Sequence, residues 1–352
     1  MVFPIQSAGS ATVHIAPPLR VATAGEALFD LIEEPDGRLK PCAGGAVYNL
    51  TRALGLQGVG TQYLNPLSGD MLGRQLARGL HEAGVALAAP TPVRAPSALA
   101  LAALDAEGKA SYSFYRDGVA DRQVTAAALN AACAALPDLQ VVATGCLALV
   151  AKDAAIYLPW LAAQRAAGCM VVVDANLRLS AVDDADAYRA NVMAALQHAH
   201  LIKVSDDDLD ALAVPGATAL ERAHTLQQQT QAQWLALTLG PEGAWLLQRD
   251  GLAMHAREEA PITVVDTVGA GDCFLAGLIT ALLGGPERGE EALALRAGGI
   301  TAPITEARLR TVLHHALASA SHCVERAGCT PPRYEEVRER LALRRPTTAE
   351  GR

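Results

Sequence analysis

The stretch Met170-Val171-Val172-Val173-Asp174-Ala175-Asn176-Leu177-Arg178 contains the clearest sign of the architecture. A short run of apolar, mostly β-branched residues leads directly into polar side chains. Similar apolar runs occur at 141–143, 201–204 and 234–239, each separated from the next by a stretch of helical length. This alternation is typical of a parallel sheet with helices packed on its faces. We therefore predict an α/β fold with a mostly parallel central sheet.

Polar or glycine residues also follow two of the other runs. The run 201–204 leads into Ser205 and three aspartates at 206–208, and the run 235–239 leads into Gly240 and Gly243. Open α/β sheets bind ligands at the carboxyl ends of their strands. Any one of these residues could instead cap a helix. Three cases in succession favour a ligand-binding edge.

The composition indicates a globular, helix-rich protein and excludes several classes of partner. The 352 residues are 51% hydrophobic and only 4% aromatic. Lysine and arginine number 29 against 37 acidic residues, a formal charge of -8. This charge would not attract a nucleic acid or an anionic membrane. We find no signal peptide and no apolar segment long enough to span a bilayer, so we predict a cytoplasmic protein.

The seven cysteines are scattered along the chain and form no CxxC pair. This spacing argues against a zinc site or a disulfide framework. We interpret them as mostly buried thiols in a reducing compartment.

The segment 97–115 differs from the helix-and-strand pattern around it. Ala98–Leu104 and Ala110–Tyr115 flank the turn sequence 105–109, which predicts a β-hairpin with a five-residue loop. A hairpin placed there is interpreted as a small lid, with an edge hairpin of the main sheet as the alternative. Residues 1–18 and 341–352 are predicted to be flexible ends.

The strongest chemical signal is Asp266-Thr267-Val268-Gly269-Ala270-Gly271-Asp272, followed by an apolar helical run. Glycines before a helix allow backbone amides to point to one place, and the helix N-terminus adds partial positive charge. Such an anion hole could stabilise a transferring phosphoryl group without a lysine. Asp272, in the first helical turn, would stay ionised and accept the proton of an attacking hydroxyl. The alternative is a structural aspartate in a glycine-rich turn.

Weaker signals lie near the N-terminus. Asp30 follows a short strand that begins near Val21, and Gly44-Gly45 opens a helix that contains Asn49. A carboxylate and an amide of this kind could bind adjacent hydroxyl groups of a polyol.

Taken together, these motifs resemble the ribokinase-like (PfkB-type) sugar kinase family in order and spacing. The similarity runs from about Val21 to Pro332 and is strongest in DTVGAGD. It implies a three-layer α/β sandwich over 19–340, with β lid segments around 30–42 and 95–118 that close over the sugar. It also implies ATP and Mg²⁺, allows a monovalent cation such as K⁺, and is compatible with a homodimer.

The resemblance assigns roles to individual positions. It implies that Asp272 is the catalytic base and that the amides of Gly269, Ala270 and Gly271 form the anion hole. The phosphate acceptor is expected to contact Asp30, Gly44, Gly45, Asn49, Arg116 and Arg178. The nucleotide side is expected to include Thr238, Gly240, Gly243 and Ser205, and the stretch 318–329 resembles the segment that lines the adenine pocket.

The phosphate acceptor is less certain than the reaction. Residues 25–30, 114–116 and 174–178 resemble fructokinases, which makes fructose the first expectation, but 2-keto-3-deoxygluconate kinases and other sugar or nucleoside kinases share much of the pattern. The aromatic residue that often follows the 174–178 element is absent. The metal-organising N-x-x-E element is replaced by Ser205 and Asp208, and the shorter acid is expected to reach magnesium through water.

Three other classes of protein are alternatives to a sugar kinase. A phosphate-loop NTPase lacks its GxxxxGK[ST] motif here, and a nicotinamide-dependent oxidoreductase lacks GxGxxG after the first strand. A non-catalytic sugar or nucleotide sensor on the same fold remains open. The presence of Asp272 beside an intact glycine frame argues against the sensor.

Overall fold

The computed structural model describes residues 17–34, 36–104, 110–249, 251–286, 295–296, 299–300 and 304–344. The predicted hairpin turn 105–109 and most of both predicted flexible ends lie outside these residues. Among the described residues, every helix is too short or too polar to cross a lipid bilayer.

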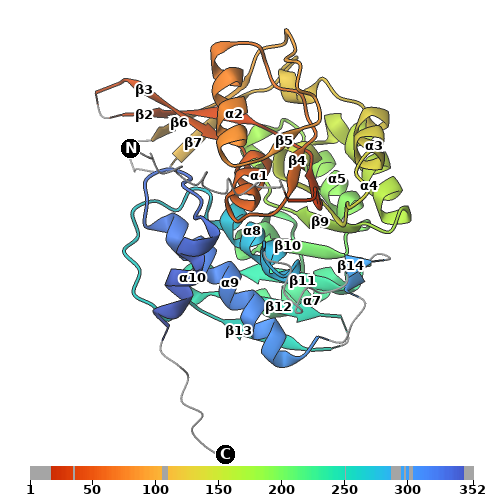
Figure 1. Ribbon diagram of the computed structural model, residues 1–352, viewed down its shortest axis with the longest axis vertical. Helices are drawn as coiled ribbons and strands as arrows, with labels where there is room; N and C mark the ends of the chain where they lie inside the picture. Colours follow the sequence, from red (N-terminus) through yellow and green to blue (C-terminus); the bar gives the residue numbers. More distant parts are fainter. Residues whose placement is uncertain are drawn as a thin grey trace, which may run out of the picture.

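A nine-stranded sheet forms the centre of the molecule, which confirms the predicted α/β class (Figure 1). Neighbouring strands are parallel except at one edge, where β12 (Ala244–Gln248) pairs antiparallel with the strand on each side of it. In spatial order they are β13 (Ala253–Ala256), β12 (Ala244–Gln248), β11 (Trp234–Thr238), β10 (Leu201–Ser205), β9 (Met170–Asp174), β8 (Val141–Gly145), β1 (Val21–Thr23), β4 (Thr61–Tyr63) and β5 (Ala86–Leu87).

Helices cover both faces of this sheet because its central strands are apolar on both sides. In β9, Val171 and Val173 join one hydrophobic core, whereas Met170 and Val172 join the other. The first core is completed by α3 (Ala126–Ala134), α4 (Ala154–Ala166), α5 (Ala185–Leu196), α6 (Asp206–Ala211) and α7 (Ala219–Gln229). The second is completed by α1 (Ala46–Leu56), α8 (Ala270–Leu282) and α9 (Glu306–Val324).

A separate four-stranded sheet projects beside α1 and α2 (Met71–Glu82) and matches the predicted lid (Figure 1). Its order is β3 (Leu39–Gly44), β2 (Leu28–Glu33), β6 (Ala98–Leu104) and β7 (Ala110–Tyr115). The strands β6 and β7 pair antiparallel with the bounds expected from the sequence. Phe29 of β2 packs with Leu76 and Leu80 of α2, so the lid has a hydrophobic base of its own.

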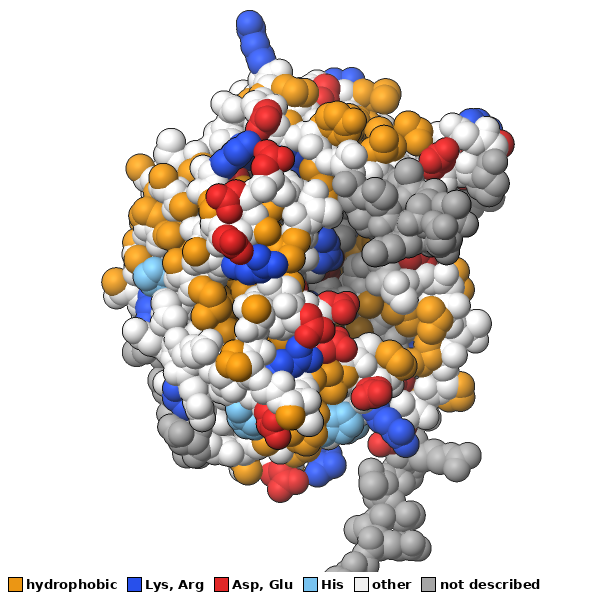
Figure 2. Space-filling model, turned by 180° about the vertical axis from the view of Figure 1, so that it is seen from behind, with side chains coloured by type: hydrophobic (Ala, Val, Ile, Leu, Met, Phe, Trp, Pro, Cys, Tyr) orange, Lys and Arg blue, Asp and Glu red, His pale blue; other side chains and the backbone are white. Residues whose placement is uncertain are grey.

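The remaining elements complete the C-terminal part. The helix α10 (Tyr334–Ala342) packs on α9, and the two-residue strands β14 (Leu295–Arg296) and β15 (Gly299–Ile300) pair antiparallel. Figure 2 shows acidic and basic side chains interspersed on the reverse face, without one large basic area among the side chains drawn in colour.

Candidate active site

Gly269 begins the helix that carries the predicted base. It is the N-cap of α8 and adopts a left-handed conformation with φ 77°. A Cβ atom added there would lie 2.2 Å from the Sγ atom of Cys329. Glycine is therefore required both by the backbone conformation and by the close approach of Cys329. The Ala270 amide already donates to the carbonyl oxygen of Thr267 at 3.2 Å, so the predicted anion hole depends mainly on the Gly269 and Gly271 amides.

Asp272 lies in the first turn of α8, and its side chain is buried. The side chain of Asn49, from α1, donates a hydrogen bond of 2.9 Å to its Oδ2 atom. The two predicted residues, 223 positions apart in the chain, are thus in contact because α1 packs against α8. Burial raises the pKa of Asp272 to about 6, although the Asn49 hydrogen bond and the Lys203 and Arg178 charges lower it. The carboxylate is therefore mostly ionised only above this pH.

Lys203 is a charged residue of this site that our sequence reasoning missed. It lies on β10, is buried, and forms an ion pair of 3.1 Å with Asp174 at the end of β9. Its Nζ atom would be 3.0 Å from a Cβ added to Gly271, so the cation lies beside the glycine loop. The expectation of an anion site without a lysine was therefore incomplete. The sequence did contain a sign of this residue's role: Lys203 interrupts an otherwise apolar strand, and lysine is rarely buried without a charged partner.

On the lid side, Asp30 of β2 and Gly44 of β3 are in direct contact. A Cβ at Gly44 would lie 2.1 Å from the Oδ2 atom of Asp30, so a larger residue would displace the carboxylate. Burial raises the pKa of Asp30 to about 6, while the charge of Arg178 lowers it and that of Asp272 raises it. Asp30 is therefore near enough to Arg178 and Asp272 for both charges to act on its carboxyl group. Arg178 is exposed and is available to a ligand.

Gly45, next to this pair, is the N-cap of α1 and has φ 100°. A Cβ there would be 2.9 Å from the carbonyl oxygen of Glu26. The buried Glu26 carboxylate accepts a hydrogen bond of 2.9 Å from the Ala46 amide, and burial raises its pKa to about 7. The sequence pattern at 25–30 does not indicate a role for Glu26, because its contact with the helix start forms only in the folded chain.

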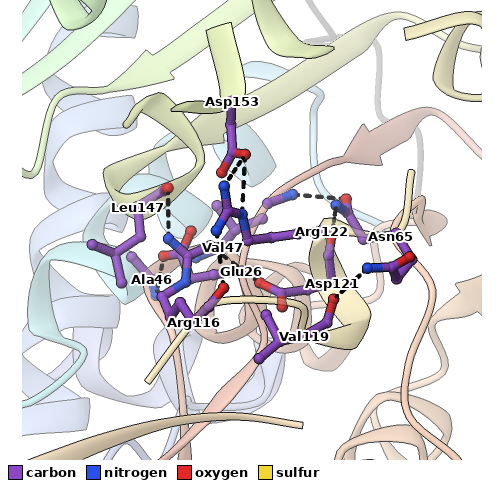
Figure 3. Close-up of polar contacts among 12 residues, drawn as sticks. Glu26, Ala46, Val47, Asn65, Arg116, Val119, Asp121, Arg122, Leu147 and Asp153 are labelled. Carbon is purple, nitrogen blue, oxygen red and sulfur yellow. Dashed lines mark hydrogen bonds and ion pairs between the residues drawn. The ribbon is translucent and has the colours of Figure 1, made fainter. Parts of the chain in front are cut away.

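Arg116 belongs to a buried polar network at the base of the lid (Figure 3). Its guanidinium forms an ion pair of 3.2 Å with Asp121 and donates to the carbonyl oxygen of Leu147 at 2.9 Å. The neighbouring Arg122 pairs with Asp153 at 2.7 Å and also donates to the Arg116 carbonyl oxygen. These contacts hold the chain segment that follows β7. The predicted contact between Arg116 and the substrate stays a prediction, and the observed role is structural.

The nucleotide-side residues lie at the ends of β10 and β11. Ser205 and Thr238 are neighbours in the sheet register, and Gly240 and Gly243 have positive φ angles of 53° and 94°. A Cβ at Gly243 would lie 2.1 Å from the carbonyl oxygen of Ala256, so this turn requires glycine.

Ser205 and Asp208 form a capping box at the start of α6. Helix capping was the alternative to ligand binding that the sequence left open for these residues. The Oδ2 atom of Asp208 accepts bonds from the backbone amide and the hydroxyl group of Ser205, at 2.8 and 2.9 Å. Its Oδ1 atom accepts one bond of 2.8 Å from the Leu177 amide. A carboxylate oxygen has two lone pairs, so Oδ1 keeps one acceptor position. This arrangement fits a magnesium contact through water better than direct coordination.

Comparisons with known proteins agree with this geometry. Residues 19–336 match the family model described as pfkB family carbohydrate kinase. A fructokinase from Rhizobium leguminosarum bv. trifolii is 30% identical over 270 residues, which cover 74% of this chain and 79% of the relative.

Two solved structures are also similar to this chain. A fructokinase from Xylella fastidiosa with bound ATP has a TM-score of 0.75 and 25% identity, with 92% of this chain and 97% of that chain covered. Aminoimidazole riboside kinase from Salmonella enterica, with aminoimidazole riboside and an ATP analog, has a TM-score of 0.73 and 23% identity, with 92% and 99% covered. The second likeness shows the fold alone.

The family match spans most of the chain and includes the buried aspartate, the glycine loop before α8 and the lid. The chain therefore belongs to the pfkB family of carbohydrate kinases, which are ATP-dependent phosphotransferases.

Proposed function

We propose that this kinase transfers the γ-phosphoryl group of ATP to a hydroxyl group of fructose, with Asp272 as the catalytic base. The observation that carries the proposal is the hydrogen bond that Asn49 donates to Asp272. The charge of Arg178, which acts on the carboxyl groups of both Asp30 and Asp272, supports it. The fructokinase name of the relative at 30% identity supports the choice of sugar.

In the proposed reaction, the acceptor hydroxyl gives its proton to the Asp272 carboxylate as its oxygen attacks the γ-phosphorus. The new oxygen–phosphorus bond forms as the bond to the β–γ bridging oxygen breaks, and ADP leaves. Phosphoryl transfer has a loose transition state, so positioning and charge stabilisation provide most of the catalysis. A buried carboxylate with a pKa of about 6 is a better base than an exposed aspartate and is still ionised at neutral pH.

Asn49 has two roles in this proposal. Its Nδ2 atom orients the base, and its buried Oδ1 atom has no hydrogen-bond partner among the described residues. An unpaired buried acceptor is costly, and a sugar hydroxyl could donate to it. Asp30 would accept further hydroxyl groups from the lid side.

The growing charge on the phosphoryl group would be stabilised by the loop before α8 and by Lys203. Asp208 would hold magnesium through a water molecule, and the ion would supply charge neutralisation at the phosphates of ATP. A requirement for K⁺ stays a prediction.

The test is magnesium-dependent ADP release from ATP with fructose, 2-keto-3-deoxygluconate, ribose, glucose, tagatose and nucleosides, including aminoimidazole riboside, as acceptors. The proposal expects the largest kcat/KM with fructose and no release by Asp272→Ala. A preference for the keto acid would change the acceptor and assign Arg178 to its carboxylate. If ATP or a sugar binds but no acceptor is phosphorylated, the chain is a sensor.

A further inference from the structure

Three cysteines converge behind the catalytic loop. The Sγ atoms of Cys273, Cys323 and Cys329 all lie within 4.8 Å of one another, and all three are free thiols. They come from the first turns of α8, the last turn of α9 and the segment after it. They are 50 and 6 positions apart in the sequence, so their spacing gave no sign of a common site.

We propose that Cys273, Cys323 and Cys329 form a binding site for a single thiophilic metal ion such as Zn²⁺, and that occupation of this site suppresses phosphoryl transfer. The inference does not depend on which sugar is the acceptor.

The geometry suits such an ion. A Zn–S bond of about 2.3 Å requires sulfur atoms about 3.8 to 4.0 Å apart, so the thiols need to approach by less than about 1 Å. Three thiolates select soft ions over magnesium, and solvent can supply a fourth ligand. Cys273 and Cys323 are fully buried, whereas Cys329 is half-buried and gives the ion a route from solvent.

Binding requires all three cysteines as thiolates. Each of the three cysteines is a free thiol that offers one sulfur atom to the ion. Binding the ion releases the thiol protons to solvent, and no electrons are transferred.

The cluster is directly connected to the loop 266–271. Cys329 packs against Gly269, and the Cys323 thiol donates to the carbonyl oxygen of Val268 at 3.6 Å. The Gly328 amide, next to Cys329, donates to the Asp266 side chain at 2.8 Å. Drawing the three sulfur atoms together would break the Cys323 contact and shift the Gly269 amide. An anion hole loses much of its effect when its donors are displaced.

The binding test is titration of the full-length chain with Cd²⁺ in the presence of a non-thiol reductant. Cadmium bound to thiolates has a charge-transfer absorption in the ultraviolet, and Zn²⁺ should displace it. We expect one strong Cd²⁺ site per chain in the wild type. In Cys329→Ser and Cys323→Ser the Cd²⁺ affinity should fall more than about 100-fold. A residue that only orients a metal ligand would cost less than this when it is replaced. Cys169→Ala, which removes a thiol outside the cluster, serves as the matched control.

Equal Cd²⁺ affinity in the wild type and both cluster variants would overturn the proposed site. The second readout is ADP release with and without Zn²⁺, each protein compared with its own metal-free rate: Zn²⁺ should lower the rate of the wild type and of Cys169→Ala, and should leave the rate of Cys329→Ser at its own metal-free value. Tight Zn²⁺ binding without loss of turnover would overturn the inhibitory role. If no sugar is phosphorylated, the absorption titration still tests the site.

Discussion

The central sheet and the lid sheet are both built from short strands, but they are buried to very different extents. Every residue of β8 and β9 is buried, because helices cover both faces. In the lid, β2 is buried at its beginning and exposed at its end, and β3 shows the reverse order along the antiparallel pair. The lid is thus anchored at its base and exposed at its tip.

This difference separates two functions. The proposed base and the anion hole come from a helix packed within the large core, where positions are held by many neighbours. Asp30 comes from the lid, close to its buried base, and in our proposal it would bind the sugar when the lid lies over the site. The proposed chemistry therefore lies in the core, and the proposed sugar selection lies in the lid.

The largest effect is expected from Asp272→Asn. This change should lower kcat by about 10²- to 10⁴-fold, because it removes the group that accepts the proton. It should not lower the unfolding temperature at pH 7, because the folded-state pKa is raised to about 6 and the buried charge is therefore unfavourable at neutral pH. Steady-state kinetics and thermal unfolding check the two parts, and near wild-type turnover would remove Asp272 as the base.

Arg116→Ala tests whether the base of the lid is held by the buried network. The change leaves Asp121 buried without its ion-pair partner, which should reduce the free energy of unfolding by about 3 to 5 kcal/mol. Arg38→Ala, at an exposed ion pair near the lid tip, should change it by less than about 0.5 kcal/mol. Denaturant titration of the wild type and both variants measures these changes in the free energy of unfolding.

A small loss for Arg116→Ala, together with a large rise in the sugar KM alone, would instead support the predicted sugar contact. That outcome would place selection at the base of the lid as well as at Asp30.

Asp30→Asn should raise the KM for the sugar by about 10- to 100-fold and leave the KM for ATP unchanged, because hydrogen bonds to a charged group are lost. Glu33→Gln, on the exposed end of the same strand, is the matched control and should change neither constant. Equal increases for both substrates would contradict a role confined to the sugar.

The smallest expected effect is a shift in the pH dependence of kcat/KM, which tests whether the lid residue Asp30 influences Asp272 in the core. Since the base must be ionised, kcat/KM should fall about tenfold per pH unit below a pKa of about 6. In Asp30→Asn this fall should begin at lower pH, because a negative charge near Asp272 is removed. A profile that is flat between pH 5 and 8 would contradict both assignments.

Much of the architecture followed from local patterns. Apolar runs of strand length, separated by helical lengths, predicted the parallel sheet, and the strands β6 and β7 matched their predicted bounds. These features depend on the spacing of apolar residues and on turn-forming residues within short stretches of the chain, so they can be identified from the sequence. The motif before α8 likewise predicted the position of Asp272 in the first helical turn.

Other features depended on which distant residues meet. The sequence could not determine that Asn49 binds Asp272, that Lys203 pairs with Asp174, or that Arg116 is held by Asp121. Nor could it bring together three cysteines that looked unrelated. By itself, the sequence determined the fold class, the phosphotransfer motif and the aspartate that we propose as the base, because these depend on short, contiguous stretches of residues. The tertiary structure decided the partners, pKa values and burial of those groups, because packing between α1, α8, α9 and the strand ends sets these distances.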